Sequence, residues 1–134
     1  MMRLCLFLAL TLFSLQARCD DCYYYWEHQC IKITDAGQRA LRQYVLLSPS
    51  INYLSSQDGQ SCDAAVAEKQ SPVNAQLLER FNNAASRIKT CQTPITELKA
   101  RVYDKPGMAT WHYDRSRKER PGKTVVMVSP LPVL

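Results

Sequence analysis

Three cysteines and a histidine gather within fourteen residues, in the stretch ARCDDCYYYWEHQC (17–30). Cys19, Cys22, His28 and Cys30 are soft ligands of the kind that tetrahedral zinc binds, and the Cys-x-x-Cys spacing also occurs in redox motifs. The cluster is more compact than the usual paired zinc ligands. Two aspartates between the first two cysteines oppose thiolate formation. We therefore predict structural disulfides and no metal or cofactor, with a thiol or zinc module at Cys19–Cys30 as an alternative.

Acid–base chemistry has few candidate residues, because His28 and His112 are the only histidines. Asp114 follows His112 by two residues, so on a strand both would share one face and the carboxylate could orient the imidazole. No Gly-x-Ser-x-Gly, His-Glu-x-x-His or glycine-rich phosphate loop accompanies them. We predict that the protein is not an enzyme, and keep a small secreted hydrolase using His112 and Asp114 as an alternative.

Basic residues concentrate near the C-terminus. Residues 99–123 hold eight Lys or Arg against three Asp or Glu, and five of these cations lie in a predicted loop, RSRKERPGK. We interpret the loop as a docking patch for a protein partner with an acidic surface, since clustered charge steers association. A solvated loop without a partner is the alternative. Nucleic acid is not expected as the partner, because the patch is short and the protein is predicted to be exported. The patch residues are Arg115, Arg117, Lys118, Arg120 and Lys123.

Four consecutive aromatic residues form a second candidate binding surface. Tyr23 to Trp26 read YYYW, and on a helix they would point in different directions. We expect Trp26 to face the core, and Tyr24 and Tyr25 to be exposed and to act as binding anchors. The alternative is that both tyrosines only fill core or surface space.

Residues 1–17 have the pattern of a signal peptide. Arg3 precedes an apolar run from Leu4 to Leu15, and Ala17 is a small residue at a cleavage position. Twelve apolar residues are too few to span a membrane as a helix. We predict an exported protein, periplasmic or secreted, with one mature domain (18–134) and no membrane span in it.

The remaining chain divides into a helical half (20–91) and a β half (98–129). Apolar positions at helical spacing predict helices over 22–47, with a soft interruption at Gly37, and over 72–91. Alternation predicts strands at 98–103, 108–114 and 123–129, and Asp58-Gly59 predicts a turn. The expected fold is α+β, an N-terminal αα-hairpin followed by a three-stranded antiparallel meander, stabilised by disulfides.

Disulfide pairs follow from that hairpin. An antiparallel arrangement brings Cys91, at the end of the second helix, beside Cys22 at the start of the first. Cys62 is then left for Cys30, and Cys19 is odd. We accordingly expect Cys22–Cys91 and Cys30–Cys62 in a small exported protein that binds another macromolecule, in an inhibitor, immunity-type or accessory role.

Overall fold

The computed structural model describes residues 20–33, 41–89, 91 and 94–134. The predicted signal peptide (1–17) and the odd Cys19 lie outside these residues. Among the residues it describes, no helix is both long and apolar enough to cross a membrane.

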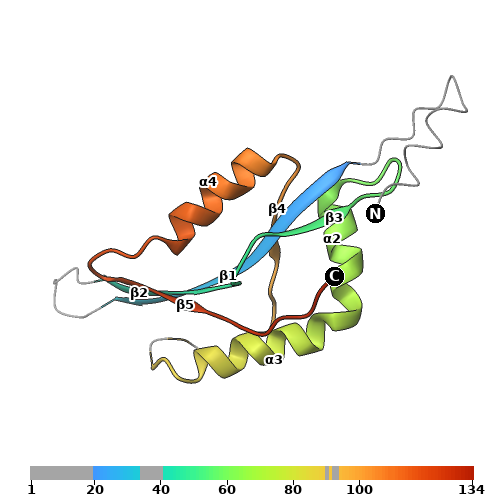
Figure 1. The fold of residues 1–134 in the computed structure, drawn as a ribbon. Coiled ribbons are helices and arrows are strands. Elements are labelled where there is room, and N and C mark those ends of the chain that lie inside the picture. Colours follow the sequence, from blue (N-terminus) through green and yellow to red (C-terminus); the bar gives the residue numbers. More distant parts are fainter. Residues whose placement is uncertain (1–19, 34–40, 90, 92–93) are drawn as a thin grey trace, which may run out of the picture.

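A long first strand organises a mixed, curled sheet of five strands (Figure 1). The strands are β1 (Asp21–Ile33), β2 (Leu41–Leu47), β3 (Asn52–Ser55), β4 (Ala100–Tyr103) and β5 (Lys123–Met127). β1 pairs antiparallel with β2 through its C-terminal half and with β3 and β4 through its N-terminal half. Because β3 and β4 both pair with residues 23–24, they lie on opposite edges of β1. β5 runs parallel to β2.

Side chains of β1 alternate between two apolar clusters, one on each face of the sheet. Cys22, Tyr24, Trp26 and Cys30 belong to the larger cluster, and Tyr25 belongs to the smaller one. Aromatic and β-branched residues favour strands when the pleated surface is covered by other elements. Here both faces are covered, and β1 is therefore apolar on both sides along residues 22–26.

The larger cluster is closed by a continuous helical run, α2 (Cys62–Gln70), η1 (Ser71–Val73) and α3 (Asn74–Ala85). Ser61 caps α2, since its Oγ accepts the Ala64 N–H at 3.1 Å. Leu77 and Phe81 of α3 are fully buried in the cluster. Another helix, α4 (Pro106–Arg117), lies on the other side of the sheet (Figure 1).

Ser48 joins β2 to β3 at a bend along the same edge of β1. Its N–H donates to the Trp26 carbonyl at 3.0 Å, and its Oγ accepts the Trp26 N–H at 3.0 Å. Glu27 pairs with Leu47, whereas Tyr24 pairs with Asn52, so the register shifts by two residues across the bend. The serine hydroxyl thus replaces the backbone acceptor that a regular ladder would supply.

The predicted αα-hairpin followed by an antiparallel meander is wrong. Residues 22–33 and 41–47 are strands, and residues 108–114, predicted as a strand, belong to α4. The pairing of β2 with β5 is parallel. The presence of both helices and strands and of disulfide bonds is confirmed.

The disulfides join Cys22 to Cys62 and Cys30 to Cys91, so the predicted pairing is also wrong. On a strand, Cys22 and Cys30 face the same side and lie about 26 Å apart along the chain direction. Cys62, at the start of α2, lies beside one end of β1, and Cys91 lies beside the other. The alternative was a zinc or thiol module at Cys19–Cys30. Two of its ligands, Cys22 and Cys30, are oxidised in these disulfides and cannot bind a metal as thiolates.

Candidate functional site

A polar cleft of about 250 Å³ lies between α4 and the outer face of the sheet, and we call it the α4 cleft. Side chains from β1, β2, β4, β5, α4 and the loop after α4 line it. They are Tyr25, Glu27, Gln29, Gln43, Val45, Arg101, Tyr103, His112, Arg115, Ser116, Arg120 and Lys123.

The packing of α4 against the smaller apolar cluster positions the cleft. Pro106 occupies the first turn of α4, where a missing N–H costs nothing. Tyr113 is buried, donates its hydroxyl to the Ser48 carbonyl at 2.6 Å and meets the Tyr25 ring edge-on at 5.1 Å. These contacts fix the orientation of α4, and Arg115 and Ser116, two and three residues after Tyr113, line the cleft.

Glu27 places one carboxylate at the bottom of the α4 cleft, with its side chain only 4% exposed. Ser116 Oγ donates to Oε1 at 2.5 Å, and Gln29 Nε2 donates to Oε2 at 2.7 Å. The Arg101 Nη2 atom lies 3.9 Å from Oε2, and 56% of the Arg101 side chain is exposed. The carboxylate is therefore held mainly by neutral donors, and the Arg101 guanidinium is accessible to a further anion.

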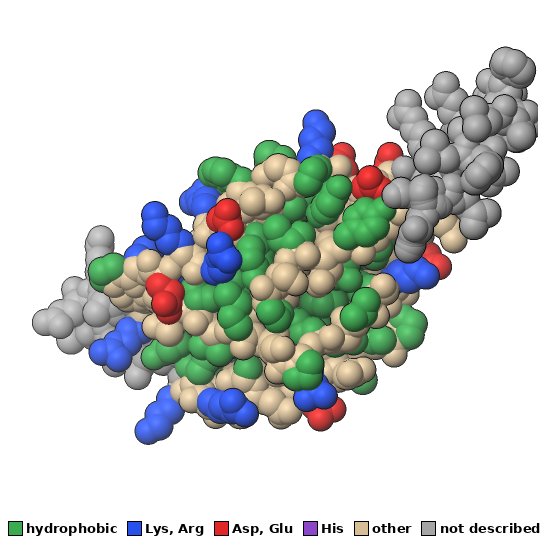
Figure 2. All heavy atoms as spheres, in the orientation of Figure 1, with side chains coloured by type: hydrophobic (Ala, Val, Ile, Leu, Met, Phe, Trp, Pro, Cys, Tyr) green, Lys and Arg blue, Asp and Glu red, His purple; other side chains and the backbone are tan. Residues whose placement is uncertain are grey.

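The α4 cleft is lined by four cationic residues and this one carboxylate: the cations are Arg101, Arg115, Arg120 and Lys123. Lys123 Nζ donates to the Arg115 carbonyl at 3.0 Å. Burial, and next the neighbouring Arg120, lower the pKa of Lys123. Figure 2 shows Lys and Arg side chains gathered over the C-terminal end of α4 and the adjacent end of the sheet. Excess positive charge at a concave surface attracts anionic groups.

An aromatic rim borders the α4 cleft on its solvent side. Trp111 is 53% exposed, and the Arg115 guanidinium lies 4.8 Å from the centre of its ring. His112 meets Trp111 edge-on at 4.8 Å and stacks on Tyr103 at 5.0 Å. Exposed tryptophan beside arginine is the composition that dominates binding energy at protein interfaces.

The structure brings only part of the predicted basic patch together. Arg115, Arg120 and Lys123 line the α4 cleft, whereas Arg117 and Lys118 do not. Arg115 and Arg117 lie in the last turn of α4 and not in the loop that we predicted. Arg117 pairs with Asp114 at 3.3 Å on the exposed surface.

Tyr24 and Tyr25 are not the exposed anchors that we predicted. They are 1% and 2% exposed, and burial raises the pKa of both side chains. Trp26 is fully buried, as expected. Trp111 on α4 is exposed instead, and the strand prediction for 108–114 concealed it. Its helical spacing from Arg115 would have indicated their contact.

His112 and Asp114 do not come together as the hydrolase alternative requires. Two residues apart on a helix, they point in different directions: His112 lines the cleft, and Asp114 pairs with Arg117. The Ser116 hydroxyl donates to Glu27, so the serine proton faces a carboxylate.

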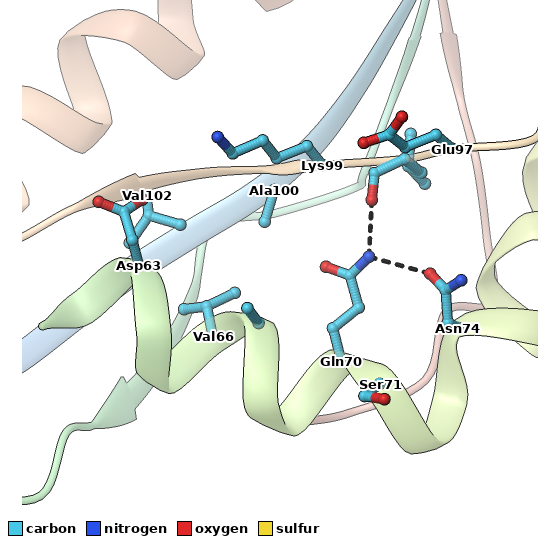
Figure 3. Close-up of a pocket in the computed structure, with 11 residues that line it drawn as sticks. Asp63, Val66, Gln70, Ser71, Asn74, Glu97, Lys99, Ala100 and Val102 are labelled. Carbon is cyan, nitrogen blue, oxygen red and sulfur yellow. Dashed lines mark hydrogen bonds between the residues drawn. The ribbon is translucent and has the colours of Figure 1, made fainter. Parts of the chain in front are cut away.

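A second hollow, of about 310 Å³, lies between α2 and β4, and we call it the α2–β4 groove (Figure 3). Gln70 reaches across one part of it. Its Nε2 donates to the Leu98 carbonyl at 2.6 Å and to Asn74 Oδ1 at 3.1 Å, and its Oε1 accepts the Trp26 indole N–H at 3.0 Å. Each atom of this amide has a partner, and Gln70 therefore has a structural role.

Comparison with protein-family models, curated proteins and solved structures found no match to this chain. The functional interpretation therefore depends on the charges, exposures and hydrogen bonds of these two surfaces.

Proposed function

We propose that this is an exported protein that acts by binding an acidic protein partner through the α4 cleft and its aromatic rim. One observation supports the proposal most strongly: four cationic side chains line the α4 cleft, and only one carboxylate, that of the buried Glu27 side chain, lies among them. Carboxylates on a partner could reach these cations while its apolar groups cover Trp111. An inhibitor, immunity-type or accessory role would use such a surface.

Two further observations support the proposal. The chain has a formal net charge of +5, which speeds association with an acidic surface at low ionic strength. Its two described disulfides suit an oxidising compartment. Export and the identity of the partner stay predictions.

The test compares two triple variants with equal loss of charge. In the cleft variant, Arg115, Arg120 and Lys123 become Ser; in the control, the exposed Lys105, Arg117 and Lys118 become Ser. Immobilised mature protein captures partners from extracellular or periplasmic extracts, and the association rate of each captured protein is then measured at low and physiological salt.

The cleft variant should associate more slowly than the control, and salt should slow the wild type more than the cleft variant. Poly-L-glutamate serves as a defined acidic probe in the same assay. Equal behaviour of the two triple variants towards both the captured protein and poly-L-glutamate would reject the α4 cleft as the binding site.

A further inference from the structure

The hydrogen bonds of Trp26 determine which backbone groups of β1 face β4. Both its N–H and its C=O bond Ser48, on the β2–β3 side of β1. In an antiparallel ladder both groups of one residue point to the same edge, and successive residues alternate. The N–H and C=O of Tyr23 and Tyr25 therefore point to the opposite edge, towards β4.

The same alternation continues into β4. Tyr25 pairs with Arg101 and Tyr23 with Tyr103, so these β4 residues use their backbone groups on β1. Ala100 and Val102 must direct their N–H and C=O groups away from β1. In the part of the chain that the structure describes, β4 pairs with no other strand. Among the described residues, one edge of β4 is thus open.

The open edge of β4 borders the α2–β4 groove. Figure 3 shows β4 crossing one side of the groove and α2 the other, with Val66 between them, Asp63 near Val102 and Gln70 towards the opposite end. Ala67 on α2 also lines the groove and is small and exposed. A strand edge with a helix beside it can accept an extended peptide, which gains main-chain hydrogen bonds from the edge.

The positive charges of Arg101 on β4 and of Lys99 just before it determine which kind of peptide can pair with this edge. Lys99 and Arg101 are exposed and alternate with Ala100 and Val102, which turn to the other face. Side chains directly across two strands attract when their charges are opposite and repel when they are alike. A second copy of β4 would bring cations together on this edge, whereas an acidic strand would pair with them. Asp63 and Glu97 exclude acidic residues from the two ends of the groove.

We propose that the α2–β4 groove binds an extended acidic segment of a protein partner, which adds to the open edge of β4 as an antiparallel sixth strand. Acidic side chains of the segment face Lys99 and Arg101, and small apolar side chains face Ala100 and Val102. The antiparallel direction is chosen because such pairs are the more stable and more frequent. This site shares Arg101 with the α4 cleft and otherwise uses residues outside it.

The test uses capped six-residue peptides of alternating glutamate and valine, labelled for fluorescence anisotropy with the full mature protein. In the proposed register the valine N–H groups bond β4, and the glutamate N–H groups face solvent. N-methylation of the valines should weaken binding about tenfold or more, because two or more hydrogen bonds are lost. N-methylation of the glutamates is the matched control and should leave binding within about twofold. Equal affinities, loss on glutamate methylation instead, or no binding of the unmodified peptide would overturn the proposal.

Three protein variants locate the peptide. Ala67→Phe fills the groove and should abolish binding, while Ala64→Phe, exposed on the same helix but outside the groove, should bind as the wild type does. The cleft variant with serine at 115, 120 and 123 should also bind the peptide normally, so a failure of the α4 proposal is distinguishable from a failure of this one. Unchanged binding by Ala67→Phe would place the peptide elsewhere and overturn the inference.

Discussion

Removal of the Cys30–Cys91 disulfide tests the covalent framework most directly. This bond closes a loop with a sequence separation of 61 residues. Loop-closure entropy for such a length gives a stabilisation of about 4 kcal/mol, and the separation of 40 for Cys22–Cys62 gives nearly the same value. Small proteins unfold with about 5–15 kcal/mol in total. The double variant Cys30→Ala, Cys91→Ala should therefore remain folded but with much of its stability lost, as measured by urea denaturation.

A crossed variant distinguishes the observed pairing from the one predicted on an αα-hairpin. Replacing Cys22 and Cys91 by Ala leaves Cys30 and Cys62, which belong to different disulfides, without their partners. Thiol titration of the denatured protein should show two more thiols than the wild type, and the loss of stability should exceed that of either matched pair. The observed pairing would be refuted if the crossed variant showed no additional thiols while the matched variant, Cys30→Ala with Cys91→Ala, showed two.

Two predictions concern single side chains. Ser48→Ala should lower the free energy of unfolding by about 1–3 kcal/mol, because the buried Trp26 N–H loses its acceptor. Urea denaturation measures this loss, and Ser50→Ala, at an exposed position, is the control. Equal effects of the two substitutions would contradict the role of the Ser48 hydroxyl. Burial raises the pKa of Tyr25 above that of an unfolded tyrosine, near 10, so its stabilisation is complete below about pH 10 and is lost as the pH rises further. Tyr25→Phe should lessen this alkaline decline, by up to about 1.4 kcal/mol per pH unit, and identical slopes for variant and wild type would contradict it.

The N-terminal half was mispredicted because its apolar spacing fits both the period of a helix and the period of a strand. Cys22, Trp26 and Cys30 are spaced by four, which matches one face of a helix, but multiples of four also lie on one face of a strand. Tyr24 distinguishes the two, since it shares the buried face with them only on a strand. The high content of aromatic residues favours the strand, and burial on both faces removed the polar alternation that would have shown it.

Local signals with a physical cause predicted the other elements better. The buried face of α3, with Leu77 and Phe81, follows the predicted helical spacing, and β4 and β5 fall within predicted strands. Gly59 forms the predicted turn with a positive φ of 76°. Pro106 is a typical helix-start residue, but the strand prediction for 108–114 did not use it. The α4 cleft could not be predicted, because β1, β4 and α4 meet there only through the tertiary fold.

The two disulfides cross-link the chain only as far as Cys91, and the residues after Cys91 have no covalent cross-link to the rest of the protein. A protease that cuts anywhere within residues 31–61 leaves two pieces that stay linked by both disulfides, because Cys22 and Cys30 lie before the cut and Cys62 and Cys91 after it. No cysteine follows Cys91, so a cut in the basic segment after α4 leaves β5 attached only by noncovalent contacts. In an extracellular setting, cleavage there would leave only noncovalent contacts to hold Lys123 at the α4 cleft, while the disulfides would still bind the helical segment to β1.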